Sequence, residues 1–439
     1  GVVLNKDGSL QRSARFRGPD LDSAVAAELV AVAGRINNAF RRLGTGWAIF
    51  VEAQRVAAAD YPDSRFPDPA SALLDAERRA GFAEQGAHFQ SEYFLTFLYL
   101  PPAEEAARAE TWLYEGRDKT GIDAGEVLLG FIDRTDRVLA LFDGIMPECR
   151  WMGDPETLTY LHSTISTQAH RVRVPETPTY LDALLADHPL TGGLEPRLGD
   201  AHLRVLTLSG FPTATTPGIL DDLNRLAFPY RWATRAILMD KMEAARMVAR
   251  IRRQWFAKRK SIAAILKEVM TNEASTLLDS DAANKAADAD EALQELGADI
   301  AGAAYITATL TVWDEDEAVA DAKLKAAEKV IQGRDFTCMP ETLNAIEAWL
   351  GSLPGHLYAN VRQPPVSTLN LVHMIPISAV WAGPARNDHL DGPPLFYAET
   401  EGSTPFRFSP HVGDVGHTLV VGPTGSGKSV LLALMALQF

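Results

Sequence analysis

The stretch Gly422-Pro423-Thr424-Gly425-Ser426-Gly427-Lys428-Ser429 decides the fold class of this chain. Two glycines separated by four residues precede Lys and Ser, which is the pattern of a phosphate-binding loop. The apolar residues Thr418–Val421 before it predict a short buried strand, and the apolar residues from Val430 onward predict a helix. This loop occurs between a strand and a helix, so the stretch predicts a nucleotide-binding α/β fold.

Each position of this loop has a physical role in holding a triphosphate. The three glycines permit positive φ angles and let backbone amides approach phosphate oxygens at a helix start, where the helix dipole favours anions. Lys428 places its charge on the β- and γ-phosphates, and Ser429 offers its hydroxyl to Mg²⁺. We therefore predict ATP and Mg as cofactors, with Ser429 as the metal ligand and Lys428 as the catalytic residue. The predicted nucleotide-binding residues are Gly422, Pro423, Thr424, Gly425, Ser426, Gly427, Lys428, Ser429 and Val430.

Phosphoryl transfer needs more than this loop. An acidic residue must hold Mg²⁺ from a later strand, and another group must orient the attacking water. Only ten residues follow Ser429, and none of them is acidic. The apolar run Leu431–Phe439 needs a sheet to cover it, so we expect the chain to be a fragment cut inside a domain. By itself it is expected to bind nucleotide weakly and to show no ATP turnover.

Composition restricts the function classes. The 439 residues include 42 basic and 57 acidic ones, and the net charge of −15 disfavours a nucleic-acid binder that acts through its overall field. The two cysteines, Cys149 and Cys338, support neither a disulfide framework nor a Cys-rich zinc site, and they suit a reducing cytoplasm. The ten histidines show no HExxH motif and no i, i+4 pair, so no histidine metal site is predicted. His411 and His417 are interpreted as structural.

The uncharged run between Arg362 and Arg386 is the best candidate for a membrane span. It contains four prolines and several amide side chains, whereas a spanning helix needs about 20 mostly apolar residues with internal backbone bonds. We predict a buried strand and loop segment here instead.

The first hundred residues alternate strands and helices. Asp7-Gly8 predicts a hairpin turn, and a stripe of Val25, Leu29, Val32, Ile36, Phe40 and Leu43 predicts a helix. Asp22 or Ser23 is its predicted N-cap, and Gly44 its predicted end. Further predicted elements are a strand at Trp47–Val51, a helix at Asp68–Arg79 and a central strand at Tyr93–Leu100. All of these are expected to surround one sheet.

The later part of the chain shows the same alternation. Residues 103 to 200 favour helix, with many loop signals. Strands are predicted at Leu203–Leu208, Arg231–Met239 and Ala304–Trp313, and another near Phe336. In Ala304–Trp313, Ile306, Leu310 and Val312 lie on one face, and Tyr305, Thr307, Thr309 and Thr311 on the other. Helices are predicted at Glu315–Gln332 and Glu341–Leu350.

A predicted long helix, Lys241–Met270, has a lopsided charge. Residues 241–267 contain nine basic residues and one acidic residue. The following stretch, 268–299, contains nine acidic residues and one lysine. The simplest interpretation is an antiparallel pair of oppositely charged helices. A docking surface for a partner or for anionic lipid, and a nucleic-acid contact, are the alternatives.

The chain divides into two predicted domains. Residues 1–384 form an N-terminal α/β domain, of α+β type with mixed sheets and helices, that could contain two related subdomains at about 1–200 and 201–384. A loop-like stretch from Ala385 to Pro394 marks the boundary. Residues 385–439 are the truncated start of a P-loop ATPase domain.

Four stretches carry a family resemblance. Gly413-Asp414-Val415-Gly416-His417-Thr418-Leu419, which runs into the loop, resembles the TrbE/CagE/VirB conjugal-transfer ATPases of type IV secretion. Three others resemble the TrbE branch, and the resemblance extends over the whole chain. They are Gly18-Pro19-Asp20-Leu21, Pro229-Tyr230-Arg231-Trp232-Ala233-Thr234-Arg235, and Ala348-Trp349-Leu350-Gly351-Ser352-Leu353-Pro354-Gly355-His356 followed by Tyr358-Ala359-Asn360-Val361-Arg362.

The resemblance implies a fold, an activity and a set of partners. The ATPase domain would be RecA-like, and the loop would be its Walker A motif. The protein would be cytoplasmic, peripherally associated with the bacterial inner membrane, hexameric, and docked on inner-membrane components of the secretion complex. It would hydrolyse ATP to energise pilus assembly or the transfer of a DNA, protein or pilin substrate.

Two other interpretations remain open at this point. One is a DNA-translocating motor of the coupling-protein type, although such motors usually carry membrane anchors and basic channel surfaces. The other is a non-catalytic N-terminal module that docks on the inner-membrane complex. Direct nucleic-acid binding therefore stays undecided by the sequence.

Overall fold

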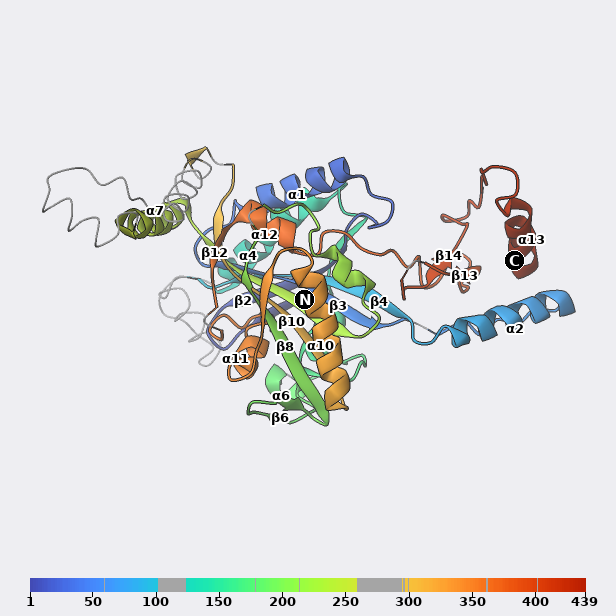
Figure 1. Ribbon diagram of the computed structural model, residues 1–439, viewed down its shortest axis with the longest axis horizontal. Coiled ribbons are helices and arrows are strands. Elements are labelled where there is room, and N and C mark those ends of the chain that lie inside the picture. The colour runs from blue at the N-terminus through green and yellow to red at the C-terminus, as the bar shows by residue number, and fades with distance from the viewer. Residues whose placement is uncertain are drawn as a thin grey trace, which may run out of the picture.

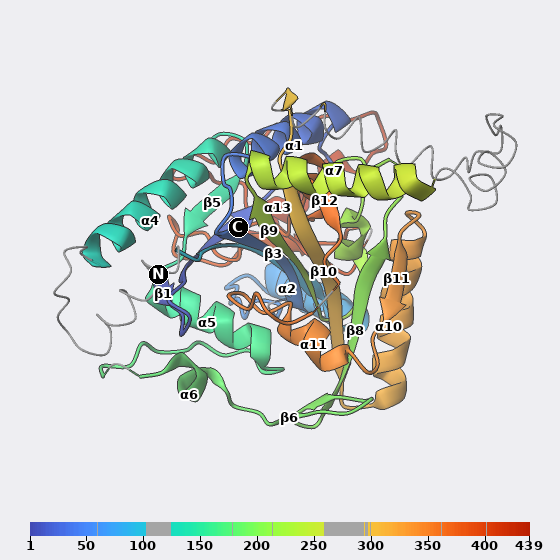
Figure 2. The ribbon, with the colours of Figure 1, turned by 90° about the vertical axis from the view of Figure 1, so that its left-hand side faces the viewer.

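The computed structural model describes most of the chain. The described residues are 1–58, 60–101, 124–177, 179–212, 214–258, 294, 297, 298, 300–360, 362–400 and 402–439. A large sheet occupies the middle of the molecule and helices lie around it, while α2 (Pro69–Glu84) and the last elements project to one side (Figure 1). Figure 2, turned by 90°, shows α10 (Glu317–Gln332) running beside strand β8 (Ala201–Gly210).

Within the part of the chain that the structure describes, the central sheet contains twelve strands, and all of its pairs are antiparallel. Nine follow one another in the order β1 (Val2–Leu4), β2 (Leu10–Arg17), β4 (Phe89–Tyr99), β3 (Trp47–Ala57), β9 (Tyr230–Met239), β10 (Ala303–Asp314), β8 (Ala201–Gly210), β7 (Arg197–Leu198) and β6 (Leu190–Thr191). The other three pair alongside: β5 (Glu148–Trp151) with β2, β11 (Thr337–Pro340) with β8, and β12 (Pro365–Ser367) with β10.

The strand order has an internal repeat. β2, β3 and β4 follow one another in the sequence, but in the sheet β4 lies between β2 and β3. In the same way β10 lies between β8 and β9, and the two groups are arranged as mirror images. The two groups meet at the β3–β9 ladder, where Ile49 pairs with Ala236 and Val51 with Thr234. One sheet therefore runs without a break through both halves of residues 1–384. The division into two subdomains remains a prediction.

Apolar side chains pack α1 and α4 against one face of the sheet. α1 (Ala26–Phe40) buries Val32, Ile36 and Phe40, and Phe131 of α4 (Ala124–Leu139) stacks on Trp47 with ring centroids 5.8 Å apart. The other helices of the described residues are η1 (Ala140–Phe142), α5 (Asp154–Ile165), α6 (Leu181–Leu185), η2 (Asp221–Arg225), α7 (Lys241–Lys258), α11 (Ala345–Leu350), α12 (Thr368–Met374) and α13 (Lys428–Gln438).

Most elements predicted from periodicity are confirmed. Gly8 has a φ of +80° in the turn between β1 and β2, and Asp68 caps α2 by accepting a bond from the Ser71 amide. β4 lies inside the sheet, between β2 and β3, as its two apolar faces predicted.

The predicted ends of α1 are wrong. Val25 is the N-cap and makes no side-chain cap bond, and the helix ends at Phe40 rather than near Gly44. The two predicted cap residues, Asp22 and Ser23, make other contacts. The Ser23 amide and hydroxyl donate to Asp20, and Asp22 pairs with Arg225. A turn therefore precedes the helix.

The helix predicted from Glu341 begins only at Ala345. The Glu341 amide donates to the carbonyl of Val205, which continues the pairing of β11 with β8 beyond the strand end. The helix ends at Leu350, as predicted, with Gly351 as its C-cap.

The basic helix is described as α7, Lys241–Lys258. Residues 259–293, and with them most of the predicted acidic partner helix, lie outside the described residues, so the predicted helix pair stays a prediction. Among the described residues no helix is long and apolar enough to cross a membrane. The run between Arg362 and Arg386 instead forms β12, α12 and a buried extended segment at Ile375–Ala379.

Candidate functional site

The predicted phosphate loop joins an extended segment to α13. Gly425 and Gly427 have φ angles of +85° and +81°, a region that favours glycine, and Gly427 is the N-cap of α13. The Leu431 amide donates to the Gly427 carbonyl at 2.9 Å and closes the first turn of the helix. Gly422 is not in the positive-φ region, but a Cβ there would lie 2.8 Å from the Ser426 hydroxyl oxygen. Its missing side chain allows a close approach within the loop.

Lys428 folds back over the loop. Its Nζ donates to the carbonyl oxygens of Gly422 at 2.9 Å and Pro423 at 2.6 Å. The ammonium group thus lies across the loop that the three glycines form, and within the described residues it makes no ion pair with a carboxylate. Ser429 and Val430 are exposed in the first turn of α13. The predicted site residues therefore form one continuous loop and helix start, open to solvent.

The strand predicted before the loop is not formed. Leu419 is 88% exposed and Val421 82% exposed, and residues 416–423 have no regular structure. A strand is stable only when a neighbouring strand takes its backbone bonds. Nearby, Val412 and Val415 form only an isolated bridge around Gly413, which has a φ of +63°.

α13 lies beside a small aromatic assembly at the projecting side of the molecule (Figure 1). β13 (Phe396–Ala398) and β14 (Phe406–Phe408) form a hairpin, and Tyr397 of this hairpin packs on Tyr61 and on Phe82 of α2 at centroid distances of 5.3 and 5.4 Å. These residues, with Leu431 and Leu434 of α13, line a cleft of about 780 Å³. His411, interpreted as structural, stacks on Phe439 with centroids 5.8 Å apart.

The hairpin is tied to the central sheet. The amide of Phe89 donates to the Ser403 carbonyl, and Arg55 Nη2 donates to the Ser403 hydroxyl at 2.8 Å. Arg407 is buried and donates to Gln90 Oε1 and to the Gly383 carbonyl. The chain is thus anchored to the N-terminal sheet up to residue 408, and the loop follows after an exposed connection.

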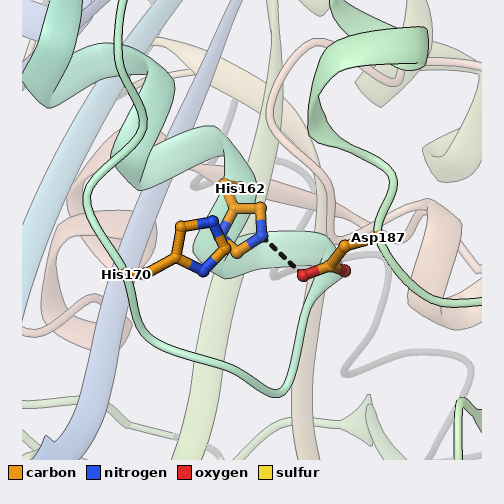
Figure 3. Close-up of side chains that lie close together, drawn as sticks. All are labelled: His162, His170 and Asp187. Carbon is orange, nitrogen blue, oxygen red and sulfur yellow. Dashed lines mark hydrogen bonds and ion pairs between the residues drawn. The ribbon is translucent and has the colours of Figure 1, made fainter.

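A second cluster of functional side chains was not predicted. His162, His170 and Asp187 each offer a possible metal ligand atom, and these atoms lie within 4.8 Å of one another (Figure 3). The separations of 8 and 17 residues match no metal-binding motif. The histidines do lack an HExxH motif and an i, i+4 pair. This lack does not exclude a histidine metal site, because the fold can bring residues together that are far apart in the sequence.

Comparisons with known proteins relate the chain to type IV secretion. A family model described as "Type IV secretion system ATPase VirB4/TrbE, N-terminal domain" matches residues 1–107. A second, "CagE, TrbE, VirB family, component of type IV transporter system", matches residues 152–362. The conjugal transfer protein TrbE of Rhizobium radiobacter is 36% identical over 460 residues, covering 100% of this chain and 55% of that protein.

Two further relatives extend the match beyond TrbE. The type IV secretion system protein virB4 of Bartonella quintana is 23% identical over 463 residues, covering 100% of this chain and 55% of that protein. The type IV secretion system protein PtlC homolog of Bordetella bronchiseptica is 23% identical over 471 residues, covering 100% of this chain and 53% of that protein.

The chain belongs to the CagE/TrbE/VirB family. Its TrbE and VirB4 members are ATPases of type IV secretion and conjugal transfer systems. The chain spans about half the length of these three relatives. The resemblance inferred from the sequence is confirmed at the level of the family. Neither family model reaches the loop at residues 422–429.

Two of the stretches that carry the family resemblance contact each other in the structure. Arg235, in the stretch from Pro229, donates to the backbone carbonyls of His356 and Ala359 at 3.0 and 2.8 Å. Those carbonyls belong to the stretch that begins at Ala348. Burial lowers the pKa of Arg235 to about 10, because it disfavours the charged guanidinium. These stretches are therefore structural partners in the core rather than parts of the nucleotide site.

Proposed function

We propose that the loop at residues 422–429 binds the phosphates of ATP with Mg²⁺, and that the full-length protein hydrolyses ATP to drive conjugal transfer. The observation that carries this is the geometry of the loop: positive φ at Gly425 and Gly427, directly before the N-terminus of α13, with the Lys428 ammonium folded across it. Backbone amides at a helix start and one fixed cation suit a phosphate chain.

The residues of this chain have distinct roles in that proposal. The amides of the loop would hold phosphate oxygens, and Lys428 would exchange its two carbonyl partners for the β- and γ-phosphates. Ser429 would supply a hydroxyl ligand to Mg²⁺, which neutralises charge on the phosphates when bound. Leu419 and Val421 are exposed, so little packing holds the loop in this shape, which supports weak nucleotide binding and no turnover by this chain alone.

We propose that the transported substrate is moved by an oligomer on the inner membrane, as the family resemblance implies. The names of the relatives support a role in conjugal transfer and type IV secretion. The hexameric state, the peripheral membrane location and the inner-membrane partners belong to this proposal, as does the RecA-like nature of the fold around α13.

The test measures binding and hydrolysis separately. Binding of a fluorescent ATP analogue with Mg²⁺ is titrated against this chain, and phosphate release is measured with the full-length protein. The proposal expects saturable, Mg²⁺-dependent binding by the chain and hydrolysis only by the full-length protein. Robust hydrolysis by this chain, or full-length protein that neither binds nor hydrolyses ATP, would contradict it.

A further inference from the structure

His162, His170 and Asp187 come together from three segments of the chain. His162 lies in the last turn of α5, His170 on the connection that follows, and Asp187 just after α6. Figure 3 shows the two imidazole rings side by side and the carboxylate of Asp187 bonded to His162. The ring centroids of the two histidines are 4.1 Å apart.

The environment of His162 is unusual for a structural histidine. The side chain is 2% exposed, and its Nε2 lies 2.8 Å from Oδ2 of Asp187. Its Nδ1 is buried and has no hydrogen-bond partner among the described residues. A buried polar nitrogen without a partner costs about 1–3 kcal/mol. Nε2 is the ring nitrogen that faces Asp187, and an imidazole nitrogen beside a carboxylate oxygen is a donor pair that one metal ion can bind.

Asp187 is arranged to serve the same site. Its Oδ2 accepts bonds from both His162 and the Ser166 hydroxyl, each at 2.8 Å. A zinc ion bound here would take His162 Nε2 and Asp187 Oδ2 in place of the hydrogen bond between them. Ser166 would continue to hold the carboxylate through its hydroxyl.

The donor set selects the kind of ion. Two imidazoles and one carboxylate suit a zinc ion, whereas Mg²⁺ and Ca²⁺ prefer oxygen ligands alone. Zinc bonds of about 2.0–2.2 Å place neighbouring ligand atoms roughly 3.3 Å apart. The present spread of up to 4.8 Å therefore has to contract. His170 is exposed on a connection and is the ligand free to move inward.

We propose that His162, His170 and Asp187 bind one Zn²⁺, which fastens the connection between α5 and β8 onto α5. The described residues between Ser166 and Asp200 form only the five-residue helix α6 and the two-residue strands β6 and β7. A connection with so little regular structure gains stability when a metal closes it. α5 is a firm anchor, because its Tyr160 stacks on Phe94 at 4.1 Å and donates to Glu52.

The test uses the whole chain and zinc alone. After treatment with a chelator, the chain is titrated with Zn²⁺ in competition with a colorimetric zinc indicator, and its thermal unfolding is followed with and without the ion. One equivalent of Zn²⁺ should bind and raise the Tm, because an ion that binds only the folded state stabilises it. Zn²⁺ should also slow proteolysis within residues 166–200.

Three variants make the result specific. His170→Ala and Asp187→Asn should each weaken zinc binding by about tenfold or more and remove the Tm shift. Both side chains are exposed enough that the fold should survive, which far-UV circular dichroism can verify. His389→Ala, which changes an exposed histidine outside this cluster, is the matched control and should bind like the wild type. Equal zinc affinity in the wild type and His170→Ala, or no binding by the wild type, would overturn the proposal.

Discussion

Glu52 of β3 and Arg231 of β9 form a buried ion pair across the ladder that joins the two halves of the sheet. Arg231 Nε lies 2.5 Å from Glu52 Oε1, and the side chains are 4% and 1% exposed. Arg231 also donates to the Thr164 carbonyl at the end of α5, and Glu52 accepts bonds from Gln54 and from the Tyr160 hydroxyl. The pair therefore connects both halves of the sheet with the helix that covers it.

Removing one partner of this pair should strongly destabilise the protein. Arg231→Met leaves the Glu52 carboxylate buried without its cation, which costs about 3–5 kcal/mol, whereas Glu52→Gln with Arg231→Met removes both charges and should recover much of that loss. Urea unfolding followed by tryptophan fluorescence measures the difference. Equal instability of the single and the double variant would show that the charge pairing is not the cause.

Asp221 should make stability depend on pH. Complete burial raises the pKa of this carboxyl to about 7, against the opposing bonds from the Ser378 amide and hydroxyl. In the unfolded chain the pKa is about 3.9, so between pH 4 and 7 the folded state binds more protons. The free energy of unfolding should therefore fall as pH rises through this window and level off above about pH 7.

Asp221→Asn removes the titrating group and should flatten this part of the curve. The difference in unfolding free energy between wild type and variant should change by a few kcal/mol, on the order of 4, between pH 4 and 8. Ser378→Ala is a useful comparison, because losing the hydroxyl donor should raise the pKa of Asp221 further. Urea titrations at several pH values provide the data, and parallel curves for wild type and Asp221→Asn would refute the assignment.

Limited proteolysis should separate the loop and α13 from the rest of the chain between residues 409 and 421. The hairpin before this stretch is held by Arg407, whereas Val412, Leu419 and Val421 are each more than 80% exposed. Thermolysin, which cuts before large apolar residues, should release a C-terminal peptide whose mass identifies the site.

Arg407→Ala serves as the comparison for this digestion. Losing the bonds to Gly383 and Gln90 should loosen the hairpin and move the first cut upstream, toward the predicted boundary at 385–394. A first cut at 385–394 in the wild type would mean that the hairpin is not part of the N-terminal unit.

Periodicity predicted most strands of the sheet, because each buried strand is a local run of apolar residues. It could not show that both faces of β10 are covered. Thr307, Thr309 and Thr311 share the second face and are almost fully buried, and Thr307 accepts a bond from Arg235, a residue 72 positions earlier. Pairing over such distances leaves no local pattern, and polar residues in a strand are normally expected at a solvated face.

The candidate sites also differ in whether a local sequence pattern reveals them. The proposed phosphate loop is eight consecutive residues, so the sequence alone shows the whole motif, whereas His162, His170 and Asp187 meet only through the fold. The buried strand predicted at Thr418–Val421 failed because an apolar run is buried only if another strand pairs with it, and the described residues provide none.

Lys428 provides the last prediction, because its bonds separate folding from nucleotide binding. Among the described residues the ammonium group bonds only to the Gly422 and Pro423 carbonyls of its own exposed loop, so Lys428→Ala should leave the unfolding free energy within about 0.5 kcal/mol of the wild type. In the proposed site the same group meets the β- and γ-phosphates. Its loss should weaken the binding of an ATP analogue by about tenfold to a hundredfold and abolish hydrolysis by the full-length protein. Lys325→Ala, an exposed lysine of α10, is the matched control and should change neither. If Lys428→Ala binds nucleotide as the wild type does, the loop is not a working phosphate site, and a role of the chain as an interaction module becomes the better explanation.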